Sequence, residues 1–298
     1  MQPKNESPFD LDAHEAYATW RAQKLDQSCR PREIVIADAH SPSIEEQKLM
    51  AEQCERSNFA LFRFANPPAD PENALRTLGH AFGLDAIDAN LCSEDSGLTE
   101  ITVKETETDN IYIPYTNRPI GWHCDGYYNP PGQEIHGMLL YCAQPAAEGG
   151  ENALLDHEIA YIRLRDQNPE WIRALMAPDA FTIPANVEGG KEIRAATSGP
   201  VFSVSNHGRN LHMRYSMRQR NVIWGDTPAT REAAAFLLDL FSSDEDHILR
   251  LKMQSGQGVL CNNVLHMRSG FSDAPDPALK RVMYRARYHD RVAIVNRH

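Results

Sequence analysis

Short apolar runs separated by Gly, Pro and Asn fill the chain from residue 111 onward, and they constrain its fold more than any other feature of the sequence. Runs of this kind with turn residues at both ends are typical of β-strands, and many such strands in succession indicate a sandwich or barrel. We therefore expect a mainly β fold with peripheral helices, in the form of a double-stranded β-helix, or jelly roll. The expected strands cover residues 135–143, 152–156, 180–183, 201–205, 211–215, 247–252, 258–262 and 281–289.

Helical patterns precede the strand-rich region and interrupt it twice. Thr227 followed by Pro228 is a typical helix start, and residues 43–57 and 71–82 carry apolar residues at helical spacing. We expect a single catalytic domain over residues 1–298, in which 1–110 form a helical and strand cover and 111–298 form the jelly-roll core. The expected helices cover residues 43–57, 71–82, 157–176 and 227–243, and short strands are expected at 60–64 and 100–104.

The charge balance limits the kinds of partner. The 298 residues contain 30 Lys and Arg against 41 Asp and Glu, a formal net charge of -11. Such acidity argues against general binding to nucleic-acid phosphates or to a membrane surface, and it favours a small-molecule or protein partner, of which we expect a small-molecule substrate. The apolar stretches are too short to span a membrane, and the polar start lacks a signal peptide's apolar core, which predicts a cytoplasmic protein. The six cysteines form no CxxC pair and are expected to be reduced.

A His-x-Asp motif is the most informative local pattern. His123 and Asp125 flank Cys124, and residues two apart in an extended strand project to the same face. A third ligand has to come from elsewhere, and His266 follows a late strand that a β-sandwich can bring alongside. Two imidazoles and one carboxylate leave three coordination positions open, which suits non-haem ferrous iron that reacts with oxygen.

The last strand carries an unusual series of arginines. Alternation places Arg281, Arg285 and Arg287 on one side of it together with Met283. A guanidinium offers a rigid two-pronged donor for a carboxylate. An arginine beside a three-ligand iron could therefore anchor a dicarboxylate whose other end chelates the metal.

Several short motifs follow one another over roughly residues 115–287, more than half of the chain. In order, they are Tyr115-Thr116-Asn117, Trp122-His123-Cys124-Asp125, Pro130-Pro131-Gly132, Gly149-Gly150-Glu151-Asn152, His266 and the RVMYR stretch from Arg281 to Arg285. In order and spacing they resemble the TauD/TfdA family of ferrous iron and 2-oxoglutarate dependent dioxygenases, including its γ-butyrobetaine and trimethyllysine hydroxylase branch.

This resemblance implies a cofactor, a cosubstrate and a reaction. It implies that His123, Asp125 and His266 bind Fe(II), and that Arg281 holds the distal carboxylate of 2-oxoglutarate. Molecular oxygen is then consumed, and succinate and carbon dioxide are released as a substrate C–H bond is hydroxylated or otherwise oxidised. Halogenating relatives lack the carboxylate that Asp125 supplies, so hydroxylation is the favoured outcome.

The sequence departs from the family pattern at some positions. Asn152 stands where the family usually has a Thr or Ser hydroxyl that bonds 2-oxoglutarate, and an amide can also donate that hydrogen bond. Arg285 matches a second family arginine, which contacts the substrate in some members and the cosubstrate in others. The spacing between His266 and Arg281 is slightly longer than in close members, so Arg281 and Arg285 could exchange roles. The usual Asp-Asn-Arg before the distal histidine reads Asn262-Asn263-Val264.

The substrate is specified only as a class. We expect a small polar metabolite, amino-acid-like or zwitterionic, because tyrosine faces attract cations. Packing is an equally good account of the tyrosines, and a solvated turn is an alternative for the basic run that contains Arg214. The candidate substrate residues are Tyr115, Asn117, Tyr127, Tyr128, Arg285 and Arg214.

Two other classes of function use the same residues. One is a non-catalytic jelly-roll protein that binds a metal or ligand, because a fold alone does not establish activity. The other is a zinc hydrolase, because zinc also accepts His and carboxylate ligands. Arg281 has an immediate task in binding 2-oxoglutarate and none in a hydrolase. The resemblance also implies a possible homo-oligomer.

Overall fold

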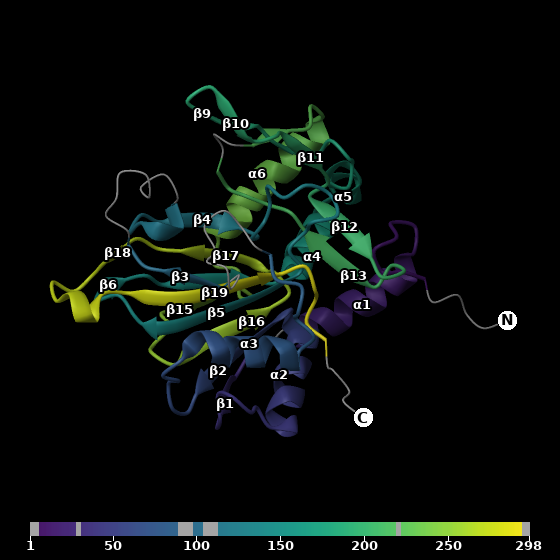
Figure 1. Cartoon of the computed structure of the whole chain (residues 1–298). Helices are drawn as coiled ribbons and strands as arrows, with labels where there is room; N and C mark the ends of the chain where they lie inside the picture. Colours follow the sequence, from purple (N-terminus) through teal and green to yellow (C-terminus); the bar gives the residue numbers. More distant parts are fainter. Residues whose placement is uncertain (1–5, 28–30, 89–97, 104–112, 219–221, 294–298) are drawn as a thin grey trace. The chain divides into compact units, whose positions relative to one another are not determined.

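The structure is a computed structural model of the chain and describes residues 6–27, 31–88, 98–103, 113–218 and 222–293 (Figure 1). The chain falls into two compact units, each built from three stretches of sequence. No described helix is long and apolar enough to span a membrane. The single domain that we expected, with a helical and strand cover over residues 1–110 and a jelly-roll core over 111–298, stays a prediction. Unit 1 comprises Met1–Cys29, Trp122–Glu134 and Leu155–Ile248, and unit 2 comprises Arg30–Gly121, Ile135–Leu154 and Leu249–His298.

A six-stranded sheet is the centre of unit 2. Its strand order is β1-β2-β16-β5-β19-β3, so strands that are distant in sequence lie side by side. The β1–β2 pair is parallel and the other neighbours are antiparallel. The strands are β1 (Glu33–Ile36), β2 (Phe59–Phe64), β16 (Gln257–Cys261), β5 (Gly137–Gln144), β19 (Val282–Tyr288) and β3 (Leu98–Ile101).

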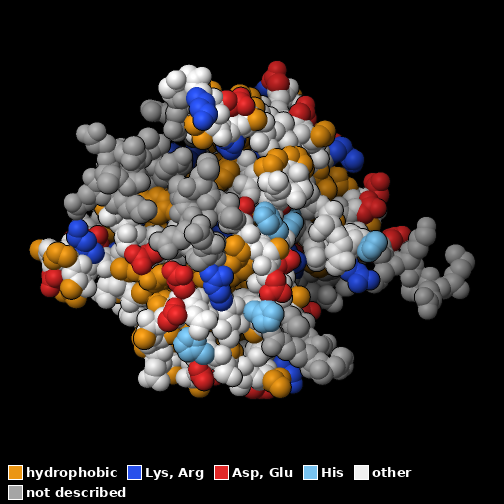
Figure 2. All heavy atoms as spheres, viewed as in Figure 1, with side chains coloured by type: hydrophobic (Ala, Val, Ile, Leu, Met, Phe, Trp, Pro, Cys, Tyr) orange, Lys and Arg blue, Asp and Glu red, His pale blue; other side chains and the backbone are white. Residues whose placement is uncertain are grey.

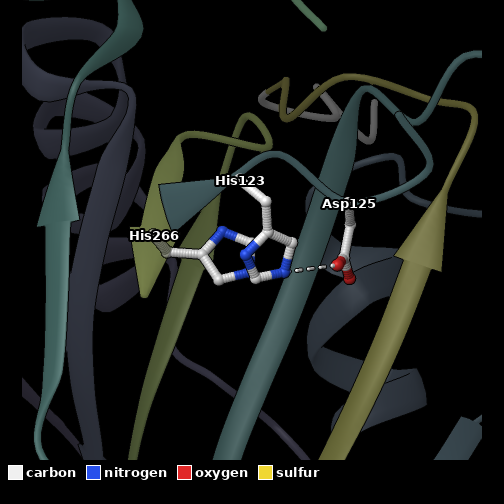
Figure 3. Close-up of side chains that lie close together, drawn as sticks. All are labelled: His123, Asp125 and His266. Carbon is white, nitrogen blue, oxygen red and sulfur yellow. Dashed lines mark ion pairs between the residues drawn. The ribbon is translucent and has the colours of Figure 1, made fainter. Parts of the chain in front are cut away.

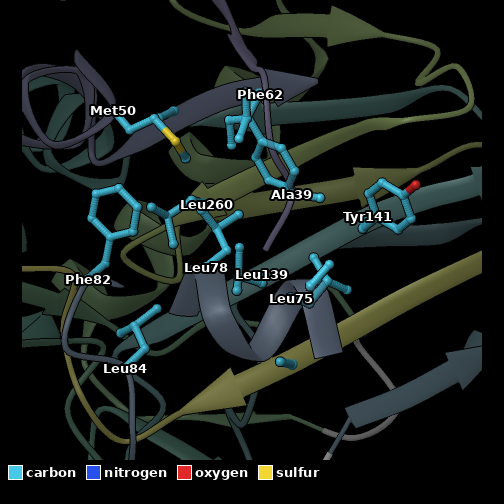
Figure 4. Close-up of a cluster of buried hydrophobic side chains, with 14 of the residues drawn as sticks. Ala39, Met50, Phe62, Leu75, Leu78, Phe82, Leu84, Leu139, Tyr141 and Leu260 are labelled. Atoms are coloured by element: carbon cyan, nitrogen blue, oxygen red, sulfur yellow. The ribbon is translucent and has the colours of Figure 1, made fainter. Parts of the chain in front are cut away.

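Two helices of unit 2 contribute to the core on one face of this sheet. Helix α2 (Ile44–Ser57) begins with a capping box, in which the Ser43 hydroxyl accepts from the Glu46 amide and the Glu46 carboxylate accepts from the Ser43 amide. Helix α3 (Pro71–Ala81) begins at the Asp70 cap with proline in its first turn. Their apolar faces pack with Phe62, Leu139 and Tyr141 of the sheet (Figure 4).

A second sheet contributes to the other core of unit 2. It contains β15 (Leu249–Leu251), β7 (Asn152–Leu155) and β17 (Leu265–Arg268), and β4 (Ile120–His123) leads the chain into unit 1. Side chains of both sheets meet in one apolar cluster that includes Leu154, Met138 and Met283. A two-stranded ribbon joins β6 (Glu148–Gly149) to β18 (Phe271–Ser272).

Unit 1 contains helices, small sheets and the segment that follows β4. Contacts link α4 with α5 and α6, and α1 with α4. Aromatic side chains fill its interior, where the rings of Trp122 and Phe241 stack at 5.1 Å. Its elements are α1 (His14–Gln27), α4 (His157–Gln167), α5 (Pro169–Leu175), α6 (Pro228–Ser242), β8 (Phe181–Ile183), β9 (Asn186–Glu188), β10 (Lys191–Arg194), β11 (Thr197–Gly199), β12 (Phe202–Ser205), β13 (Asn210–Met213) and β14 (Ile223–Trp224).

The predicted fold class, mainly β with peripheral helices, is confirmed, and all of the core strands expected from the sequence are present. The prediction of one helical stretch over residues 157–176 is wrong in one respect, because the structure has two helices there, α4 and α5. Asn168 is extended and caps the second helix, and Pro169 cannot continue the first one. Figure 2 shows acidic and basic side chains interspersed on the described part of the visible face.

Candidate metal centre

Strand pairing fixes the backbone of the His-x-Asp motif. The Met217 amide donates to the Trp122 carbonyl (2.8 Å), and the Cys124 amide donates to the Tyr215 carbonyl (3.0 Å). The strand ends at His123 and a turn begins at Asp125, which differs from the continuous strand that we expected. The two side chains still converge, with His123 Nε2 3.5 Å from Asp125 Oδ1.

A buried arginine holds the turn that follows Asp125. The guanidinium of Arg214 donates to the carbonyls of Tyr127 (2.7 Å), Phe181 (2.8 Å) and Thr197 (2.9 Å). Burial lowers the pKa of Arg214 to about 10, so it stays a cation at neutral pH. The substrate role suggested for Arg214 stays a prediction, and its observed contacts are those of a brace.

Aromatic rings lead away from His123 within unit 1. The Tyr127 ring meets the His123 ring edge-on at 6.5 Å and the Tyr128 ring at 5.2 Å. The guanidinium of Arg194 lies 5.9 Å from the Tyr128 ring and donates to the carbonyls of Pro184 and Ala195. Sequence reasoning missed Arg194, because a single arginine at the end of a short hairpin carries no signal of its neighbours.

His266 lies in β17 of unit 2. Its Nδ1 lies 2.9 Å from the Val264 carbonyl, which can only accept a hydrogen bond. In the neutral tautomer that donates this bond, Nε2 carries the lone pair, as in metal-bound histidines. The two asparagines before Val264, of which Asn262 replaces the usual Asp, secure the preceding turn. Asn262 donates to the Asn58 side chain, and Asn263 donates to the Ile135 carbonyl.

His123, Asp125 and His266 each offer one ligand atom, and these atoms all lie within 4.8 Å of one another (Figure 3). No other group of His, Cys, Asp and Glu in the described ranges meets this criterion. Two imidazoles and one carboxylate fit the donor set of non-haem Fe(II), and zinc also accepts them. The donor set therefore supports a metal site but does not distinguish Fe(II) from zinc.

A buried cation lies in unit 2 where the cosubstrate anchor was predicted. Arg281 is 6% exposed, and its guanidinium forms no hydrogen bond or ion pair with any residue that the structure describes. Its guanidinium carbon lies 5.0 Å from the centre of the Phe271 ring. Burial lowers its pKa, as expected for a charge without a bound anion.

Gly150 borders both predicted cosubstrate residues. A Cβ atom at this position would lie 3.9 Å from Arg281 Nε. The Gly150 carbonyl accepts a hydrogen bond from the side-chain amide of Asn152 at 3.3 Å. Its φ of +73° is a conformation that glycine adopts readily. Arg281 and Asn152 are thus both adjacent to one turn, and their shared role in binding 2-oxoglutarate stays a prediction.

The remaining predicted residues occupy different environments. Arg285 is half-buried in β19, opposite Thr99 and Leu140, whereas Tyr115 is buried. The Asn117 carbonyl accepts from the Phe271 amide at 3.1 Å, and its side chain is exposed. Their substrate roles stay predictions.

Curated relatives and solved structures resemble this chain. A uridine-5'-phosphate dioxygenase of an Amycolatopsis species is 31% identical over 173 residues, which are 56% of this chain and only 60% of that protein. A uridine-5'-phosphate dioxygenase of a Streptomyces species is 26% identical, covering 65% of this chain and 69% of its own.

The non-heme iron oxygenase OrfP, in complex with Fe, succinate and (3S)-hydroxy-L-Arg, has a TM-score of 0.61 at 16% identity, covering 97% of this chain and 92% of its own. An asparagine oxygenase has a TM-score of 0.55 at 12% identity, covering 90% and 89%. These structures share the jelly-roll fold. The model of the family described as "Taurine catabolism dioxygenase TauD, TfdA family" matches residues 21–287. The chain therefore belongs to the TauD/TfdA family of dioxygenases.

Proposed function

We propose that this enzyme uses Fe(II), 2-oxoglutarate and molecular oxygen to oxidise a C–H bond of a small polar metabolite, with release of succinate and carbon dioxide. The convergence of the candidate ligand atoms of His123, Asp125 and His266 within 4.8 Å carries the proposal. The bound iron and 2-oxoglutarate would supply the oxygen chemistry, and the chain would supply binding, orientation and exclusion of side reactions.

The described contacts support a separate task for each predicted residue. His123, Asp125 and His266 would hold the metal. Arg281 would bind the distal carboxylate of 2-oxoglutarate, because its buried guanidinium forms no ion pair with any of the described residues. Asn152 would add an amide donor. A zinc hydrolase would leave this buried charge without a purpose, so we rank it lower. The match to a dioxygenase family favours an enzyme over a non-catalytic binder.

The substrate class is part of the proposal. The sequence suggested an amino-acid-like or zwitterionic metabolite, with Tyr127 and Tyr128 as candidate contacts. The curated relatives introduce a second candidate, a nucleoside monophosphate, because both are named uridine-5'-phosphate dioxygenases. Arg194 and Arg214 place positive charge near those tyrosines, which suits a substrate with an anionic group. Hydroxylation as the outcome, a cytoplasmic location and a homo-oligomer stay predictions.

The direct test is anaerobic addition of Fe(II) and 2-oxoglutarate to the purified protein. We expect a weak visible charge-transfer band, followed after admission of oxygen by succinate release that depends on substrate. Amino acids, uridine 5'-monophosphate and uridine form the first panel. His123→Ala and Asp125→Ala should remove both signals, whereas His14→Ala, at an exposed position of α1, should remove neither. Absence of the band and of succinate across the panel would refute the proposal.

A further inference from the structure

Arg268 is a second deeply buried arginine of unit 2, two residues after His266 in β17. It is 5% exposed, and its guanidinium forms no ion pair with a residue in the described part of the chain. A buried cation is expensive unless dipoles or an anion compensate it. The groups around the Arg268 guanidinium should therefore show what compensates its charge.

Backbone carbonyls compensate part of this charge. The guanidinium donates to the Pro114 carbonyl (3.4 Å), the Thr116 carbonyl (2.8 Å) and, in a short contact, the Arg118 carbonyl. A planar guanidinium reaches several acceptors from one fixed position. Arg268 thereby ties β17 to the segment of residues 114–118, which contains two of the predicted substrate residues.

Phe271 connects this brace to Arg281. The guanidinium carbons of Arg268 and Arg281 lie 4.9 Å and 5.0 Å from the centre of its ring. The Phe271 amide also donates to the Asn117 carbonyl of the braced segment. Burial, and secondly the charge of Arg281, lower the pKa of Arg268 to about 9. Two like charges thus share one aromatic ring, an arrangement that favours a bound anion.

We propose that Arg268 is a positioning residue for 2-oxoglutarate, which holds the Phe271 ring and, through it, the Arg281 guanidinium in place for the distal carboxylate. This inference rests on the proposed function. It assigns Arg268 an indirect effect on cosubstrate affinity and no direct contact with the metal. Loss of Arg268 should therefore weaken 2-oxoglutarate binding and leave metal affinity unchanged.

A double-mutant cycle between Arg268 and Phe271 tests the route of the effect. The Kd of 2-oxoglutarate is measured by calorimetry for Arg268→Met, Phe271→Leu and the double variant, with Mn(II) in place of Fe(II) to prevent turnover. We expect each single change to raise Kd about tenfold, typical of losing a supporting partner. The double variant should also raise the Kd of 2-oxoglutarate about tenfold relative to wild type, because both changes break the same connection. Arg250→Met, at an exposed position of β15, is the control and should leave Kd unchanged.

Each outcome decides between the alternatives. A Kd of Arg268→Met equal to that of the control, or effects that multiply to about a hundredfold in the double variant, would overturn the inference. If Arg268→Met does not fold, Phe271→Leu alone decides, because an unchanged Kd would exclude the route through the ring. Wild-type protein that binds no 2-oxoglutarate would overturn the proposed function and this inference together, whereas wild-type binding with unaffected variants refutes the inference only.

Discussion

Replacing Arg281 by methionine is expected to have opposite effects on the ligand-free protein and on 2-oxoglutarate binding. The arginine is 6% exposed, and its guanidinium has no hydrogen-bonding or ionic partner among the described residues. Replacing a buried charge by an apolar side chain of similar length is often neutral or stabilising, by about 1–4 kcal/mol in the most favourable cases. Truncating one partner of a buried charge pair costs about 2–5 kcal/mol of binding free energy, which raises Kd at least about thirtyfold.

Urea unfolding with and without 2-oxoglutarate, in the presence of Mn(II), separates the two effects. At a ligand concentration of about 100 times its Kd, the wild-type protein should gain about 2.7 kcal/mol in free energy of unfolding. A hundredfold weaker variant should gain only about 0.4 kcal/mol at the same concentration. Arg250→Met, which removes an exposed arginine of the same unit, should behave as wild type. An Arg281→Met protein that is several kcal/mol less stable without ligand, and that keeps the full gain with it, would refute this reasoning.

Two further predictions concern ion pairs of unit 1, the first buried and the second half-buried. Lys24 Nζ lies 2.6 Å from Asp156 and 2.5 Å from Glu158, so Lys24→Met should lower the free energy of unfolding by about 3–5 kcal/mol in urea titrations. A loss below about 1 kcal/mol would contradict it. Hydrogen bonds from Arg163 lower the pKa of Glu245 from 4.5 to about 2. Because the folded-state pKa is depressed, this stabilisation is present above about pH 4.5 and is lost as the pH falls towards 2. The stability difference between wild type and Glu245→Gln should shrink over that window, and a constant difference would exclude this contribution.

Local patterns predicted most of the elements because their causes are local. Apolar runs between turn residues produced the strands, and the capped start at Ser43 produced α2. The metal motif was equally accessible, since His123 and Asp125 are two residues apart. The third candidate ligand, His266, depended on the expected fold and on the family resemblance, because nothing near His266 specifies its distant partners.

Contacts between distant segments account for what the sequence did not reveal. Helix α1 has a polar sequence and was not predicted as a separate element. It is secured by partners far along the chain, including the Lys24 pairs and the hydrogen bond from Tyr17 to Asp166. Arg214 and Arg268 were missed as braces for a similar reason. Their acceptors are backbone carbonyls, which are present at every residue and leave no mark in a sequence.

The choice of carbonyls as acceptors has an electrostatic consequence at each brace. A carboxylate partner would hold Arg214 or Arg268 in place equally well, but it would also cancel the positive charge. Carbonyl dipoles accept hydrogen bonds from the guanidinium without neutralising its charge, and they do not titrate. Within unit 2, Arg268 and Arg281 therefore both keep their positive charge beside the Phe271 ring, although the protein as a whole carries a net charge of -11. Arg268→Glu should accordingly weaken 2-oxoglutarate binding more than Arg268→Met does, because it adds a negative charge to the site as well as removing the brace.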